Sequence, residues 1–148
     1  YLQALAAPLP LPRRSDPTLA RLGGWDGLAA EVTSLARQEK ARFIAAEEYG
    51  LAAGLAFRVP GDMPVVAMDQ RWRFFGLPPV PEGQAGLLIR SERRGEGPPL
   101  WPGAMPVTDP VGRLIRHRAG QEAEAYRIFR VTSVAGQPPT AMLPHPKR

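Results

Sequence analysis

Two short, mainly apolar runs, residues 42–46 and 63–68, enclose a helical pattern and constrain the fold more than any other feature of the chain. Runs of this length are typical of strands that are buried on both faces of a sheet. Between them, two glutamates precede a segment at 49–57 whose leucines and alanines repeat along one side. A strand, a helix and a second strand in this order predict a compact βαβ unit with parallel strands.

The rest of the chain adds further elements to this unit. Residues 25–36 carry apolar side chains at the spacing of one helix face, and residues 85–90 form a third apolar run. Residues 113–118 and 125–131, separated by a turn near 119–120, indicate an antiparallel hairpin. The predicted fold class is therefore α/β: a small mixed sheet with a parallel βαβ core, flanked by helices and followed by a C-terminal antiparallel hairpin.

The length of 148 residues and the 44% of hydrophobic residues suit one domain, which we place at 16–135. Residues 1–15 are rich in proline and begin with a charge-free stretch that is too short to cross a bilayer. We interpret them as a proline-rich tether that follows a membrane helix. The tail at 136–148, which contains several prolines, is expected to be disordered.

The net charge of +5 favours an anionic partner, although an arginine-rich composition also arises from genome bias. Nucleic acid is not expected, because no run of basic residues is interleaved with aromatic ones along a predicted strand or helix in the manner of a single-strand binder. The chain has no cysteine and only two histidines, which excludes thiolate and histidine-rich metal sites. It also lacks the common nucleotide-binding and hydrolase motifs. We therefore predict no catalytic residue, no metal site and no cofactor within this domain.

Candidate ligand-binding residues follow the two predicted parallel strands. Tyr49 comes after the first strand, and Asp69, Arg71 and Trp72 come after the second. Pockets of open α/β sheets lie beyond the carboxyl ends of the strands. A charged fork beside an aromatic ring at this edge suits a phosphorylated or sugar ligand. The alternative is that Trp72 covers an edge of the core, that Tyr49 faces the core, and that the arginines lie in solvent.

A series of short motifs in the first half of the chain resembles one known family. Their order and spacing are similar to those of the soluble C-terminal domain of bacterial dolichyl-phosphate-mannose-protein mannosyltransferases, glycosyltransferase family 39. The motifs are Pro8-Leu9-Pro10, Asp16-Pro17, Gly24-Trp25, Leu28-Ala29, Glu48-Tyr49, Ala52-Ala53, Leu55-Ala56-Phe57, Pro60-Gly61, Pro64-Val65 and Arg71. The resemblance implies a parent enzyme that spans the membrane several times and uses a polyprenyl-phosphate-linked sugar donor. The catalytic acid of that family lies in a loop of the membrane portion, so no catalytic residue transfers to this chain.

Together these observations predict an extracytoplasmic, membrane-attached accessory domain. Its expected partners are its own transmembrane domain, anionic lipid headgroups and the polyprenyl-phosphate sugar. A first rival is a free-standing α/β domain that binds a phosphorylated or sugar ligand at Asp69, Arg71 and Trp72. A second rival is an adaptor whose hairpin edge extends the sheet of a partner protein, in which case a proline within 128–131 should break the association.

Overall fold

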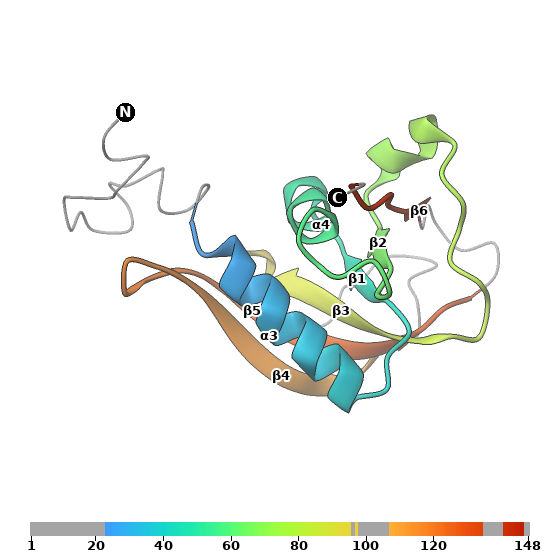
Figure 1. Cartoon of the computed structure of the whole chain (residues 1–148). Coiled ribbons are helices and arrows are strands. Elements are labelled where there is room, and N and C mark those ends of the chain that lie inside the picture. The colour runs from blue at the N-terminus through green and yellow to red at the C-terminus, as the bar shows by residue number, and fades with distance from the viewer. Residues whose placement is uncertain (1–22, 96, 98–106, 135–140, 147–148) are drawn as a thin grey trace.

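The computed structural model describes residues 23–95, 97, 107–134 and 141–146. It is a mixed α/β fold with a curled sheet and two α-helices on it, as the sequence predicts for the fold class (Figure 1). The elements are α3 (Trp25–Gln38), β1 (Ile44–Ala46), α4 (Tyr49–Ala56), β2 (Val65–Ala67), the 3₁₀ helix η1 (Gln70–Phe75), β3 (Ala85–Ser91), the 3₁₀ helix η2 (Glu92–Arg94), β4 (Val107–Arg118), β5 (Gln121–Thr132) and β6 (Ala141–Met142).

The strands are ordered β4-β5-β3-β1-β2-β6. The three central strands are parallel, and Ala45 of β1 pairs with Val66 of β2 on one side and with Leu88 of β3 on the other. The long strands β5 and β4 continue the sheet in antiparallel fashion beyond β3, and β6 pairs with the opposite edge. The three-residue strands β1 and β2 are thus buried in the interior of the sheet, which explains why they are apolar throughout.

Both α-helices contribute to a core on one face of the sheet. Buried side chains of α3, such as Leu28 and Val32, and of α4, such as Leu51 and Leu55, belong to this core. The buried strand residues in the same cluster are Ile44, Ala46, Val65, Ala67, Leu87, Ile89, Tyr126, Ile128 and Ala141. Burial of these apolar surfaces is the main source of stability for the domain.

The opposite face carries a second, smaller core. Phe43, Leu88 and Phe129 are buried there together with neighbouring valines, and Val80 from the connection between β2 and β3 packs against them. Gly86 allows the close approach of the Phe43 ring, since a Cβ added at Gly86 would lie 2.3 Å from it. In the part of the chain that the structure describes, this face is therefore covered by the connection between β2 and β3 and not by a helix.

Several expectations about boundaries differ from the structure. The strand β4 begins at Val107, well before the predicted start at residue 113. Pro110 and Gly112 are residues that usually interrupt a strand, but β4 lies at the edge of the sheet and accommodates them with irregularities in its pairing. Residues 128–131 lie in β5, which pairs with a strand on each side and is no sheet edge. A proline there would disrupt the domain itself, so the adaptor experiment would have to address β4.

The C-terminal tail also differs from the expected disorder where it is described. Ala141 and Leu143 are buried, and β6 pairs with β2. The buried side chains of Ala141 and Leu143 and the pairing of β6 with β2 thus hold this part of the tail on the sheet. The expected tether at 1–15 lies outside the described residues. In the part of the chain that the structure describes, no helix is both long and apolar enough to cross a membrane.

Candidate functional site

The carboxyl ends of β1 and β2 lie where the chain changes from one face of the sheet to the other. The connection from β1 to β2 is α4, which packs on the helix-covered face, whereas the connection from β2 to β3 places Val80 on the opposite face. Ligand sites of open α/β sheets form in the crevice at such a switch point. The side chains that follow β1 and β2 thus occupy the position at which a ligand site is expected.

Four residues nominated from the sequence come together at this position. The rings of Tyr49 and Trp72 stack with centroids 4.5 Å apart and an interplanar angle of 14°. The Arg71 guanidinium lies 4.8 Å from the Tyr49 ring centroid and donates hydrogen bonds of 3.0 and 2.7 Å to the two carboxylate oxygens of Asp69. The Phe75 ring lies 5.4 Å from that of Trp72. We call these five residues the Asp69 cluster.

The charged groups of the Asp69 cluster are engaged with one another. Asp69 also accepts a 2.9 Å hydrogen bond from the backbone N–H of Arg71 and thereby caps η1. Hydrogen bonding from the Arg71 side chain holds the pKa of Asp69 below its usual value. Trp72 is only 9% exposed, and Tyr49 and Phe75 pack against its ring. A ligand at this position would therefore have to compete with Asp69 for the guanidinium.

The two glutamates that follow β1 are also paired with arginines. Glu47 lies 3.4 Å from Arg90 of β3, with both side chains almost buried, and Glu48 lies 3.3 Å from Arg94. Burial raises the pKa of Glu47, although the charges of Arg90 and Arg94 oppose this change. Glu47 and Glu48 are thus paired with arginines from the segment that includes β3 and η2, whereas Asp69 pairs with Arg71 of its own segment.

A second group, centred on Glu124, lies at the same end of the sheet, and the sequence interpretation missed it. Glu124 accepts hydrogen bonds of 2.5 Å from the Ser91 hydroxyl and 2.7 Å from Arg93, and its other oxygen lies 3.3 Å from Arg116. Arg116 also donates to the Tyr126 hydroxyl at 3.2 Å. We call these five residues the Glu124 cluster. Ser91 and Glu124 are 33 residues apart in the sequence, so the cluster exists only in the folded chain.

The Glu124 cluster is buried more deeply than the Asp69 cluster. The side chain of Arg116 is fully buried and that of Glu124 is 6% exposed. Burial raises the pKa of Glu124, but hydrogen bonding from Ser91 and the charge of Arg93 outweigh it, so the pKa lies below its ordinary value. Burial raises the pKa of Tyr126 to about 12. At neutral pH this group is an ionised carboxylate surrounded by donors.

A cavity of about 250 Å³ opens beside the Glu124 cluster. The indole of Trp25 forms part of its wall and lies 4.4 Å from the Arg116 guanidinium, measured to the ring centroid. The remaining lining residues are Glu48, Gly50, Leu51, Arg93, Glu124 and Tyr126. The cavity combines hydrogen-bond donors and acceptors with an aromatic ring, and it is smaller than the roughly 300 to 1,000 Å³ of pockets for drug-sized ligands.

The sequence signal for the Glu124 cluster was weak. Arg116 and Glu124 face each other across the hairpin, and this pairing becomes evident only when the register of β4 on β5 is known. A bulge between Arg116 and His117 shifts that register. The one available signal was Glu124 itself, a charged residue that stands between two alanines in a mainly apolar strand. Such a residue needs a partner of opposite charge when the strand is buried.

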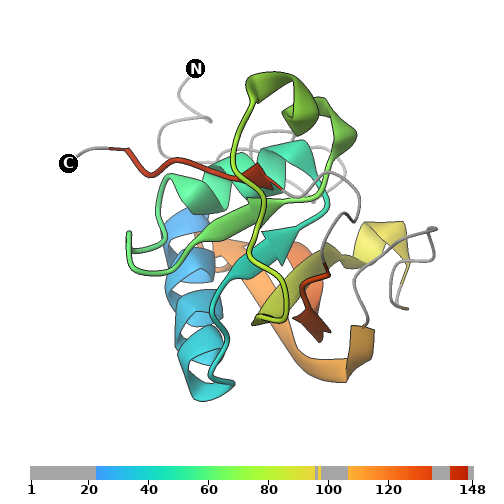
Figure 2. The ribbon, with the colours of Figure 1, turned by 90° about the vertical axis from the view of Figure 1, so that its right-hand side faces the viewer.

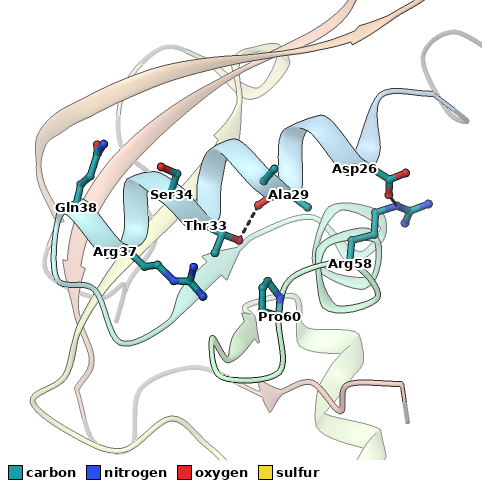
Figure 3. Close-up of a pocket in the computed structure, with 9 residues that line it drawn as sticks. Asp26, Ala29, Thr33, Ser34, Arg37, Gln38, Arg58 and Pro60 are labelled. Atoms are coloured by element: carbon teal, nitrogen blue, oxygen red, sulfur yellow. Dashed lines mark hydrogen bonds and ion pairs between the residues drawn. The ribbon is translucent and has the colours of Figure 1, made fainter. Parts of the chain in front are cut away.

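A groove of about 640 Å³ runs along the exposed side of α3 (Figure 3). Small side chains such as Ala29 and Ser34 line it, and Thr33 donates a 2.7 Å hydrogen bond to the Ala29 carbonyl. Ion pairs join α3 to the segment after α4 near both ends of the groove: Asp26–Arg58 at 2.9 Å and Arg37–Asp62 at 3.2 Å. The groove could hold a ligand by its shape, but most of its polar side chains already form ion pairs or hydrogen bonds within the protein.

Comparisons with known proteins yield no relative: no protein-family model, curated protein or solved structure matches the chain. Among the described residues, no group of three or more histidines, carboxylates or cysteines is arranged to hold a metal ion.

Proposed function

We propose that this chain is a non-catalytic accessory domain of a polytopic membrane glycosyltransferase that uses a polyprenyl-phosphate-linked sugar donor. In this proposal the domain faces the periplasm or the cell exterior. Its partners are its own transmembrane domain and the anionic membrane surface. Its role is to help position the acceptor or the lipid-linked donor for a reaction that takes place in the membrane portion.

One observation carries the non-catalytic part of this proposal. The carboxylates at the switch point each form an ion pair with an arginine: Glu47 with Arg90, Glu48 with Arg94, and Asp69 with Arg71, two residues further along the chain. A general acid or base must exchange its proton with a substrate that it can reach. Carboxylates that are tied to guanidinium groups suit a rigid, charged surface better than a reaction centre.

The membrane context is supported by the sequence. The motifs shared with the C-terminal domain of the mannosyltransferase family cover roughly the first half of the chain. The net charge of +5, most of it from arginine, also suits a position beside phosphate headgroups.

Deleting residues 16–135 from the parent enzyme tests the accessory role. We expect sugar transfer from the polyprenyl-phosphate donor to fall, or the choice of acceptor to change, while the membrane portion still accumulates. The matched control is Asp62→Ala in the full-length enzyme, which removes an exposed ion pair and should leave transfer unchanged. If the deletion variant transferred sugar to the same acceptors at the same rate, the domain would have no accessory role.

The cavity beside the Glu124 cluster favours a second candidate function, binding of a small sugar or sugar phosphate by the domain itself. A hexose phosphate added to the isotope-labelled chain should shift the indole N–H resonance of Trp25 in a saturable way. Arg93→Ala should remove this shift, because Arg93 lines the cavity and is 60% exposed. Arg37→Ala, at the distant groove, is the control. A resonance that does not move with the hexose phosphate would exclude this candidate.

A further inference from the structure

We propose that η1 is a membrane-contact element, which places Phe74 and Phe75 into the interface of an anionic bilayer while Arg71 and Arg94 meet its phosphate groups. This inference deepens the proposed function and rests on it for the choice of a membrane as the partner. It assigns the contact to one short segment at the carboxyl end of the sheet.

The first observation is the exposure of two adjacent aromatic side chains. Phe74 is 75% exposed and Phe75 is 59% exposed, and both belong to η1. In both views η1 lies at the periphery of the molecule (Figures 1 and 2), where Trp72 packs it against Tyr49 of α4. Single exposed apolar residues are common on soluble proteins, but two neighbouring aromatic rings on a peripheral element mark an interaction surface.

The second observation is that η1 is held firmly in this orientation. Asp69 caps its first turn, and Gly76, with a φ of 59°, ends it in a left-handed conformation that favours glycine. Trp72 anchors the element because it is buried and stacks on Tyr49 of α4. Since Trp72 fills the inward position, the neighbouring Phe74 is presented outward. A preorganised contact loses little conformational entropy on binding.

The third observation is the charge beside the aromatic pair. Arg71 belongs to η1 and is 65% exposed, and Arg94 is 54% exposed. The charge of Arg94 also contributes to the lowered pKa of Asp69, which places it near η1. Among the described ion pairs at this end of the sheet, five arginines share four carboxylates: Arg71, Arg90, Arg93, Arg94 and Arg116 against Glu47, Glu48, Asp69 and Glu124. The excess is positive.

Aromatic rings beside exposed arginines match the chemistry of a bilayer interface. Aromatic side chains prefer the region between headgroups and acyl chains, and basic residues are attracted to anionic lipids. An apolar protein groove would cover the phenylalanines but would offer no anionic group to the excess of arginines at this end of the sheet. The combination therefore favours a membrane over a second copy of this chain.

Flotation of the complete 148-residue chain with lipid vesicles tests the inference. The probes are vesicles of phosphatidylcholine alone and of phosphatidylcholine mixed with phosphatidylglycerol. We expect the chain to float with the mixed vesicles, to bind phosphatidylcholine more weakly, and to dissociate as salt is added. The double variant Phe74→Ser/Phe75→Ser should bind the mixed vesicles roughly tenfold more weakly or worse.

Matched variants distinguish binding through η1 from non-specific binding of the chain to vesicles. Phe57→Ser removes a phenylalanine that is 62% exposed but lies at the end of α4, and it should bind like the unchanged chain. Arg71→Gln should weaken binding, whereas Arg37→Gln, at a comparably exposed arginine in the α3 groove, should not. Urea unfolding of each variant verifies that the fold is retained.

Three results would overturn the inference. They are a chain that ignores mixed vesicles, a double variant that binds them as well as the unchanged chain, and a dimer in sedimentation that the double variant abolishes. The last result would identify a second copy as the occupant. None of them bears on the deletion experiment above, so a failure of the membrane contact and a failure of the accessory role remain distinguishable.

Discussion

The Asp69 cluster and the Glu124 cluster lie at the same end of the sheet and contain the same kinds of side chain, yet they are built differently. The Asp69 cluster comes mostly from one short segment, since Asp69, Arg71, Trp72 and Phe75 are near neighbours in the sequence. The Glu124 cluster joins β3, β4, β5 and η2, and its central pair, Arg116 and Glu124, is almost completely buried. A local cluster can be exposed and still form, whereas a cluster of distant residues requires the whole sheet.

The largest expected effect is in the Glu124 cluster. Glu124→Leu leaves the fully buried Arg116 without its carboxylate and should lower the free energy of unfolding by about 3 to 5 kcal/mol in urea. Asp62→Ala, which removes an exposed ion pair, should cost less than about 1 kcal/mol. The double variant Arg116→Met/Glu124→Leu should recover much of the loss. Equal costs for Glu124→Leu and Asp62→Ala would remove the distinction between buried and exposed clusters.

A smaller loss is expected in the sheet that supports both clusters. Gly86→Ala would place a Cβ 2.3 Å from the Phe43 ring, so the ring must move within a packed core. We expect the free energy of unfolding to fall by about 1 to 3 kcal/mol. Gly61→Ala is the control, because nothing lies within 4 Å of the added Cβ. A Gly86→Ala protein as stable as the control would show that this face is loosely packed.

The Asp69 cluster should respond more weakly. Asp69→Ala removes the cap of η1 and an ion pair with an exposed arginine, and should cost about 1 kcal/mol of unfolding free energy. Chemical denaturation under the same conditions as for Glu124→Leu provides the comparison. A cost as large as that of Glu124→Leu would mean that the exposed cluster is as important to the fold as the buried one.

The pH dependence should sharpen the contrast between two carboxylates at this edge. The lowered pKa of Glu124 means that its contribution to stability is present above the ordinary glutamate pKa and is lost as the pH falls through the folded-state value. The raised pKa of Glu47 acts in the opposite sense: its contribution is fully present below the ordinary value and is lost as the pH rises through the folded-state value.

Glutamine substitutions separate the two contributions. Below the ordinary glutamate pKa, Glu124→Gln should flatten the rise of unfolding free energy with pH. Above that value, Glu47→Gln should make the slope of unfolding free energy against pH more positive. Denaturation curves at a series of pH values measure both slopes. Slopes that change in the same direction would contradict the assigned pKa shifts.

The sequence was sufficient for the features that depend on local patterns. The helix that begins at Trp25, the apolar central strands and the mixed α/β class follow from periodicity and burial. The proximity of Tyr49 to Arg71 and Trp72 follows from their positions after neighbouring parallel strands. What the sequence did not reveal was that Arg71 would turn back onto Asp69, because a capping geometry depends on the exact path of the chain after β2.

Features that depend on the register of strand pairing could not be predicted from the sequence. Arg116 and Glu124 meet only because of the pairing of β4 with β5, and β4 contains irregularities near Pro110 and His117. A shift by one residue would turn each side chain to the other face of the sheet. The position of β6 on β2 was equally hard to predict, since a strand of two residues gives almost no periodic signal.

The central claim is that this domain belongs to a membrane-spanning transferase, and the coding sequence upstream of Tyr1 tests it most directly. The account predicts several segments of about 20 apolar residues, with an acidic residue in the first extracytoplasmic loop. A start codon close to Tyr1 would contradict it, and would make the cavity beside Glu124 the leading candidate for the function of a self-contained protein.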